Sequence, residues 1–231
     1  PIGAMYAALG LHRCLPHSHG SQGCCAYHRS ALTRHYKEPI MAATSSFTEG
    51  ASVFGGQSNL VSAIDTIFTV YNPDIIAVHT TCLSETIGDD VPMFISEYRR
   101  AHARASLPPI VHVSTPSYQG THMQGFHKAV RATVAGLAEE KQKTAMDPGR
   151  INLFPGMVSP ADLRHLKEIV GHFGLEAMLL PDYSMTLDGS LWESYQRIPT
   201  GGTAVENIAA SSTAAASIEM NRGFPPDSCP M

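Results

Sequence analysis

Hydrophobic residues along the chain alternate between helical spacing and short unbroken runs, which is typical of βαβ units. The clearest helical pattern covers 57–71, and Pro73 ends it. The clearest unbroken run is Ile75 to Val78, within a strand predicted over 74–81. Because such a run has no polar face, it suits a strand that is buried on both faces of a parallel sheet.

The rest of the chain continues this alternation. Further strands are predicted at 40–44, 110–114, 151–154 and 176–180. Further helices are predicted directly after Cys24 and at 91–103, 122–142, 160–173 with Ser159 as N-cap, and the Ala-rich segment 203–220. Residues 45–56 are predicted to form a loop. The pattern therefore predicts an α/β fold with Rossmann-like α/β/α layers and mainly parallel sheets.

One interruption predicts a domain boundary. Residues 143–150 contain Asp147-Pro148-Gly149 and break the periodicity. A first α/β domain is then expected over 1–145 and part of a second over 151–231. The 231 residues suffice for one large domain or for one domain plus part of another. Because the chain starts without Met and ends in a Pro- and Cys-containing tail, we expect a partial chain with a truncated second domain.

Composition and charge exclude several classes of protein. The formal net charge is −4 and no basic cluster is present, so nucleic acid is not expected as a partner. No apolar run approaches the roughly 20 residues of a spanning helix, so no membrane insertion is expected. The five cysteines are odd in number and unevenly spread, which fits a reducing cytoplasm better than a secreted disulfide framework.

Two of these cysteines lie where strands are predicted to meet helices. Cys24 follows Gly23 and precedes a predicted helix, whose positive end favours a thiolate. Cys82 directly follows the strand predicted over 74–81. Both are predicted to sit at turns, and thiolates at the ends of neighbouring strands can converge on a soft metal centre, as iron–sulfur clusters require.

A hydroxyl group is predicted beside Cys82. Thr115-Pro116-Ser117 follows the strand predicted over 110–114. In open α/β sheets the carboxyl ends of parallel strands share one edge, where ligands bind. We therefore expect Cys82 and Ser117 to lie close together.

Six sequence blocks carry a resemblance to a known family. They are Pro1 to Ala4, His17 to Cys24, Ser46 to Glu49, Val53 to Gly56, Thr80 to Asp90 and Thr115 to Ser117. In these blocks the chain resembles the β chains of nitrogenase molybdenum-iron proteins. The resemblance covers about Pro1 to Gly125 and continues more thinly through Phe154-Pro155-Gly156.

The resemblance implies a role in nitrogen fixation. Family members pair an α and a β chain in an α2β2 heterotetramer around an iron–sulfur 8Fe-7S P-cluster. This cluster relays electrons from the ATP-driven iron protein to the iron-molybdenum cofactor in the α chain, where dinitrogen is reduced to ammonia. The chain would therefore be an oxidoreductase subunit for electron transfer, with no catalytic residue of its own.

Individual residues match positions of the family. Cys24 and Cys82 match thiolate ligands of the P-cluster, and Ser117 matches a serine whose oxygen can join an iron of the oxidised cluster. Tyr27 matches a residue beside the cluster, and Glu38 a carboxylate of a metal site between two β chains. In the family a third cysteine ligand stands just before the residue that matches Pro1, so the fragment alone is expected to be inactive.

Structural interpretations stand beside these assignments. Buried cysteines are often inert, and we assign that role to Cys14 and Cys25, whereas Cys229 lies in the unusual tail. Ser117 can also serve as a turn residue, and Glu38 as a solvated carboxylate. Hydrogen-bonded structural roles are predicted for most histidines, among them His17, His19, His79, His112 and His122.

Other functional classes remain open. A zinc module could use Cys14, His17, His19 and Cys24, but their spacing matches no usual zinc pattern and leaves Cys82 unused. A cofactor-assembly scaffold related to the β chain, or a vanadium or iron-only nitrogenase, shares much of the pattern. The complete cysteine motifs and Thr115-Pro116-Ser117 favour the reductase over the scaffold. The segments Ser21-Gln22-Gly23 and Gly55-Gly56-Gln57 resemble the molybdenum type more than the vanadium or iron-only type. A simple nucleotide-binding domain is disfavoured because no Gly-x-Gly-x-x-Gly follows a strand.

Overall fold

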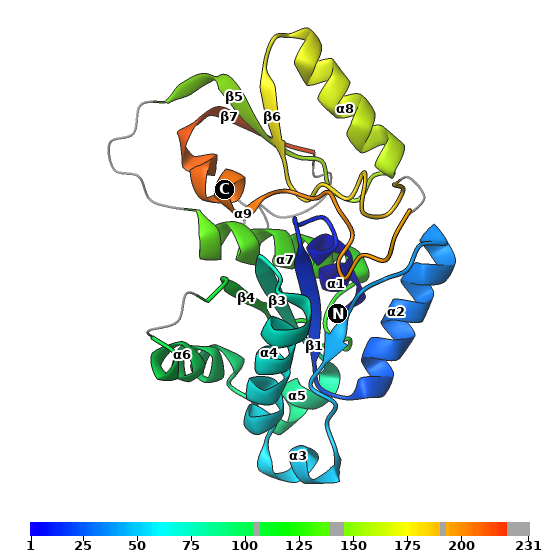
Figure 1. Cartoon of the computed structure of the whole chain (residues 1–231), viewed down its shortest axis with the longest axis vertical. Coiled ribbons are helices and arrows are strands. Elements are labelled where there is room, and N and C mark those ends of the chain that lie inside the picture. The colour runs from blue at the N-terminus through cyan, green and yellow to red at the C-terminus, as the bar shows by residue number, and fades with distance from the viewer. Residues whose placement is uncertain (104–106, 139–145, 190–192, 221–231) are drawn as a thin grey trace.

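A computed structural model describes residues 1–103, 107–138, 146–189 and 193–220 (Figure 1). The strands of these residues form two sheets, one in the order β2-β1-β3-β4 and one in the order β6-β5-β7. Every strand pair in both sheets is parallel, and helices flank the sheets. The predicted α/β class with Rossmann-like layers is therefore confirmed.

The elements of the described residues have the following bounds. The strands are β1 (Cys14–His19), β2 (Ala43–Thr44), β3 (Ile75–Thr80), β4 (Ile110–Val113), β5 (Asp147–Phe154), β6 (Glu176–Leu179) and β7 (Ala214–Glu219). The helices are α1 (Ile2–Ala8), α2 (Gln22–Tyr36), α3 (Glu49–Phe54), α4 (Gln57–Tyr71), α5 (Cys82–Ile87), α6 (Val91–Ala101), α7 (His122–Leu137), α8 (Pro160–His172), α9 (Val205–Ala209) and the 3₁₀ helix η1 (Ala210–Thr213).

The first sheet is covered on both faces by helices. Helices α1, α2 and α7 pack on one face around Met5 and Phe126, and α4 and α6 pack on the other around Ile64 and Phe94. Successive residues of β3 alternate between these two cores, as expected for side chains of a strand. This burial on both faces explains the unbroken apolar run that identified β3 in the sequence.

Helices with a strong local signal occur as predicted. Helix α4 has the predicted bounds, and Asn72 ends it in the left-handed conformation. Helix α8 begins after Ser159, whose side chain accepts a hydrogen bond from the Asp162 amide. Helix α7 ends at Leu137, earlier than predicted, and residues 139–142 of that prediction lie outside the described residues.

Three elements near the amino terminus lack a sequence signal. Helix α1 was not predicted, α3 lies inside the segment predicted to be a loop, and β1 was missed. All six residues of β1 are buried, although Pro16 and three polar residues interrupt any apolar run. Strand β2 is shorter than predicted and pairs with β1 only at His17 and Ser18. Tertiary pairing therefore decides this part of the sheet.

The prediction of one long helix over 203–220 is wrong. Helix α9 ends at Ala209, and residues 214–219 form β7, which pairs in parallel with β5. Pairing with β5 satisfies the backbone of this segment, and it outweighs the high helix propensity of alanine.

The two sheets occupy separate stretches of the chain, and hydrogen bonds join the loops beside them. The first sheet ends at Val113, and the second begins at Asp147, inside the segment predicted as a boundary. The backbone of Gly10 accepts hydrogen bonds from the amides of Asp182 and Thr203, both at 2.9 Å. The division into domains 1–145 and 151–231 stays a prediction, and parts of both ranges lie outside the described residues. Among the described helices, none is long and apolar enough to cross a membrane.

Candidate functional site

Three of the residues that the sequence singled out follow three adjacent parallel strands. Cys24 lies in α2, which follows β1, Cys82 is the first residue of α5, which follows β3, and Ser117 lies in the loop after β4. The sheet order places β1, β3 and β4 side by side. The carboxyl ends of β1 and β3 are level, because His19 pairs with Thr80. All three residues therefore lie at the edge where α/β sheets bind ligands.

The prediction of turns at the cysteines needs a correction. Cys24 and Cys82 both lie in the first turn of a helix, as the third residue of α2 and the first residue of α5. Helix α2 begins at Gln22, before the cysteine, because the chain turns already at Gly20 and Ser21. Both thiols thus lie in the first turn of a helix, at the positive end of the helix dipole.

Cys82 and Ser117 are in direct contact, as expected from the sequence. The Ser117 amide donates a hydrogen bond to the Cys82 sulfur at 3.1 Å. Burial favours the neutral thiol, but hydrogen bonds from the Ser117 side chain and from the amides of Ser117 and Tyr118 outweigh it and lower the pKa of Cys82. The site thus places a thiol with a lowered pKa beside a hydroxyl group.

Hydroxyl groups at the ends of β3 and β4 hold the Ser117 loop in place. The Thr115 amide donates to the Thr80 hydroxyl at 2.8 Å, and the Thr115 hydroxyl donates to the Thr80 carbonyl at 3.0 Å. The hydroxyls of Thr80 and Ser114 both donate to the carboxylate of Glu85 in α5. These bonds attach the loop to the helix that begins with Cys82. The roles of Thr80, Ser114 and Glu85 were not predicted from the sequence, although hydroxyl residues at the ends of two predicted strands could have indicated them.

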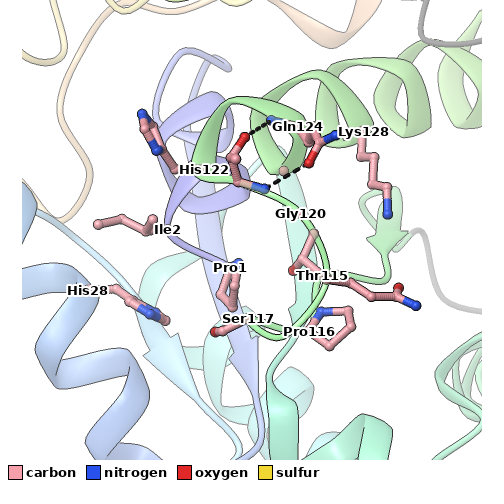
Figure 2. Close-up of a pocket in the computed structure, with 13 residues that line it drawn as sticks. Pro1, Ile2, His28, Thr115, Pro116, Ser117, Gly120, His122, Gln124 and Lys128 are labelled. Carbon is pink, nitrogen blue, oxygen red and sulfur yellow. Dashed lines mark hydrogen bonds between the residues drawn. The ribbon is translucent and has the colours of Figure 1, made fainter. Parts of the chain in front are cut away.

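The other face of the site comes from α2. Tyr27 and His28 are three and four residues after Cys24, so they share its helix face. The Tyr27 side chain is 72% exposed. His28 points toward the Ser117 loop, and burial lowers its pKa to about 4 (Figure 2). At neutral pH this imidazole is therefore uncharged.

A cavity of about 120 Å³ lies between these elements. His28, Thr115, Ser117, Gln124 and Lys128 are among its lining residues, and Figure 2 shows them around one opening. The lining combines the Lys128 ammonium group with hydroxyl, amide and imidazole groups. It borders the same loop that contacts Cys82, so it belongs to the same site.

The remaining cysteines differ from Cys24 and Cys82. Cys14 and Cys25 are buried, and burial raises the pKa of both thiols. The Cys25 thiol donates a hydrogen bond to the Ala43 carbonyl at 3.5 Å. Both therefore have the surroundings of inert structural cysteines. Cys229 lies outside the described residues.

Glu38 lies away from this site. It follows the end of α2 and is half buried. At the helical rise, Cys24 and Glu38 are roughly 20 Å apart along the axis. The structure therefore does not bring Glu38 to the cysteines, as expected if it belongs to a separate site.

The histidines take different roles. His17 and His19 both hydrogen-bond the Ser45 hydroxyl at 2.8 Å, as predicted for structural histidines. His79 is a correction, because it is buried and neither ring nitrogen has a hydrogen-bond partner. Burial lowers its pKa well below the usual value, so the ring is neutral.

The donor set fits part of an iron–sulfur site. Two thiols suit iron as soft ligands, and a serine oxygen is a harder ligand that suits a more oxidised metal. No group of three or more His, Cys, Asp or Glu side chains that could hold a metal ion is found in the part of the chain that the structure describes. The four residues of the zinc alternative therefore do not come together, and a cluster at Cys24 and Cys82 needs further ligands from another chain or segment.

Comparisons with known proteins identify the family. The profile of the family described as nitrogenase component 1 type oxidoreductase matches residues 1–226. The chain is 53% identical over 208 residues to the nitrogenase molybdenum-iron protein beta chain of Clostridium pasteurianum, covering 90% of this chain and 45% of that protein. It is 40% identical over 221 residues to the protein of the same name from Nostoc sp., covering 95% of this chain and 43% of that protein. The chain thus spans less than half the length of these relatives.

Solved structures agree with this result. A chain of "Nitrogenase Cp1 at pH 6.5" superposes with a TM-score of 0.89 at 51% identity, covering 94% of this chain and 47% of that chain. A chain of "Nitrogenase Cp1 at pH 5" has a TM-score of 0.67 at 17% identity, covering 93% of this chain and 41% of that chain, which supports the fold alone. The resemblance that we noted in the sequence is confirmed. The chain belongs to the family of nitrogenase component 1 type oxidoreductases.

Proposed function

We propose that this chain forms the β-type half of a P-cluster site in a molybdenum nitrogenase, with Cys24 and Cys82 as thiolate ligands. The observation that carries the proposal is the contact between Cys82 and Ser117 at the carboxyl ends of β3 and β4. Cys24 follows the adjacent strand, and both cysteines lie in first helical turns. The two relatives named above are both molybdenum-iron protein beta chains, which supports the same metal system.

Each group has a physical task in this proposal. The amide and hydroxyl of Ser117 stabilise negative charge on the Cys82 sulfur before and after it binds iron. The Ser117 hydroxyl, which hydrogen-bonds this sulfur, would also be the residue to hold an iron of the oxidised cluster, since a hard alkoxide prefers more oxidised iron. When bound, the cluster supplies electron storage and relay. In this proposal Tyr27, three residues after Cys24, would lie on the side of α2 that faces the cluster.

The remaining ligands and the reaction itself belong to partners. We propose that an α chain contributes the other half of the 8Fe-7S cluster and carries the iron-molybdenum cofactor. An ATP-using iron protein would deliver the electrons, and the working unit would be an α2β2 tetramer for the reduction of dinitrogen. Glu38 is proposed as a metal ligand at the contact between two β chains, away from the cluster.

Iron and sulfide analysis tests the ligand assignment. The full-length form of the chain is co-expressed anaerobically with its α-type partner, and iron, acid-labile sulfide, molybdenum, vanadium and zinc are measured. Cys82→Ala should lose cluster iron and sulfide, because one thiolate is gone. Cys14→Ala should keep both, because Cys14 is buried at the opposite end of β1.

The outcomes separate the candidate functions. Equal loss of iron in Cys82→Ala and Cys14→Ala would overturn the assignment of Cys82. Iron without sulfide, or zinc in its place, would indicate a different metal protein. Vanadium in place of molybdenum would assign the chain to the vanadium system and leave the P-cluster proposal intact.

A further inference from the structure

The carboxyl end of β1 is attached to both ends of α5, the helix that begins with Cys82. The His19 carbonyl accepts hydrogen bonds from the Thr81 amide at 3.1 Å and from the Ser84 hydroxyl at 2.9 Å, at the start of α5. The His19 ring reaches beyond the other end of α5, where Nε2 lies 3.0 Å from the Asp89 carboxylate. One residue therefore fixes the whole helix against the strand that leads to Cys24.

The His19–Asp89 pair is deeply buried. The side chains are 0% and 4% exposed. Burying two polar side chains lowers the stability of the fold unless each is fully hydrogen-bonded. Asp89 also accepts from the Gly56 amide at 3.1 Å, and the Phe47 ring packs edge-on against His19 at 5.0 Å between centroids. The pair is thus enclosed by the turn that precedes α4.

His17, Ser45, His19 and Asp89 form one chain of hydrogen bonds, in which each donor and acceptor can be assigned. The Asp89 carboxylate only accepts, so His19 Nε2 donates to it. Burial keeps the pKa of His19 below its usual value, so the ring is neutral and its Nδ1 accepts from the Ser45 hydroxyl. The Ser45 oxygen then accepts from His17 Nε2. Each donor in this chain of side chains has one acceptor, so the hydrogen bonds define one geometry for the four residues.

We propose that the buried His19–Asp89 pair positions Cys24 and Cys82 relative to each other. His19 is followed directly by Gly20, which lies against Thr81, and five residues later by Cys24. Asp89 fixes the far end of the helix that carries Cys82. The inference rests on the proposed function, because the spacing of the two sulfurs matters for a shared cluster. His19 and Asp89 act as positioning residues and do not touch the metal.

Iron release from the assembled protein tests this inference. The full-length chain is assembled anaerobically with its α-type partner, and the rate of iron transfer to a chelator is measured. Asp89→Ala should raise this rate about tenfold, since loss of an outer residue of a metal site typically weakens metal affinity by about ten- to a hundredfold. Asp89→Asn should behave like the wild type, because its oxygen can accept from Gly56 and its amide can donate to a flipped tautomer of His19.

Two controls make the test specific. Asp74→Ala removes an exposed His–Asp contact, 2.8 Å from His12, at the other end of the same strands, and should leave iron release unchanged. Ile64→Val weakens the core under the first sheet without touching the pair. The melting temperature and the spectrum of the oxidised cluster are recorded for each variant, and Asp89→Ala should alter the spectrum.

The outcomes distinguish the two proposals. Equal iron release in Asp89→Ala and Asp74→Ala would overturn the positioning role and leave the cluster assignment in place. Equally fast release from Ile64→Val at the same melting temperature as Asp89→Ala would also overturn it, since general destabilisation would then explain the effect. Absence of iron and sulfide from the wild-type assembly would overturn the proposed function and this inference together.

Discussion

Gly20→Ala tests a close contact between the two cysteine-bearing segments. Gly20 follows β1 with φ +141°, a conformation that side chains other than glycine rarely adopt. An added Cβ would lie 1.9 Å from the Thr81 hydroxyl oxygen and 3.1 Å from the Thr81 Cβ. Thr81 cannot move away freely, because it is buried and its hydroxyl donates to the His19 carbonyl at 3.2 Å.

The expected loss of stability combines two effects. The unfavourable φ costs about 1–3 kcal/mol. Overpacking against a buried side chain costs about 1–3 kcal/mol more. Gly20→Ala should therefore lower the free energy of unfolding by about 2–6 kcal/mol, a large part of the roughly 5–15 kcal/mol of a typical domain.

Urea unfolding of the chain, followed by circular dichroism, measures this loss. Thr81→Ala alone should cost about 0.5–1.5 kcal/mol for one hydrogen bond, since the His19 carbonyl keeps its other donors. In the double variant, which combines Gly20→Ala with Thr81→Ala, the clash with the Thr81 hydroxyl is gone but the strained φ of residue 20 remains. The double variant should therefore be more stable than the sum of the single effects predicts, by about 1–3 kcal/mol.

Gly171→Ala is the matched control. No atom lies within 4 Å of a Cβ added at Gly171, and this residue lies in α8. Replacement by alanine should be neutral or should stabilise the chain by up to about 1 kcal/mol. The reasoning is refuted if Gly20→Ala stays within about 0.5 kcal/mol of the wild type, the range of ordinary surface substitutions. Additive effects of Gly20→Ala and Thr81→Ala would refute the steric part alone.

Two further predictions concern buried polar groups. Tyr183→Phe should lower the free energy of unfolding in urea by about 1–3 kcal/mol, because the hydroxyl donates to the Val158 carbonyl at 2.7 Å and accepts from its amide at 3.0 Å. An unchanged urea midpoint would show that solvent replaces these bonds. Burial lowers the pKa of His17 from 6.5 to about 3, so the unfolded chain binds more protons between these values and stability should fall as the pH falls below 6.5, by up to about 1.4 kcal/mol per pH unit. His17→Asn should flatten this acid dependence in urea titrations, and an unchanged slope would contradict the assignment.

Elements with strong local patterns were predictable from the sequence. Strand β3 and helix α4 followed from apolar runs and helical spacing, because burial on both faces or on one face leaves a direct trace in the order of residues. The meeting of Cys82 and Ser117 also followed, since parallel strands place their carboxyl ends at one edge. Local signals and one topological rule were enough for these features.

Features that depend on distant partners were not predictable. Strand β1 contains Pro16 and polar residues, and it exists because β3 pairs with it along its whole length. Strand β7 is Ala-rich and favours a helix locally, but β5 provides a ladder for its backbone. The predictions failed at these elements because the pairing energy comes from residues far away in the chain.

The sequence by itself determined the α/β class, the family resemblance and the chemical identity of the candidate ligands Cys24, Cys82 and Ser117. These follow from residue type, periodicity and motif order, which are local properties of the chain. Only the tertiary structure decided that His19 and Asp89 join β1 to both ends of α5. Residues 70 positions apart in the chain form this pair. Their contact depends on the packing of strands and helices between them, and no local pattern in the sequence encodes it.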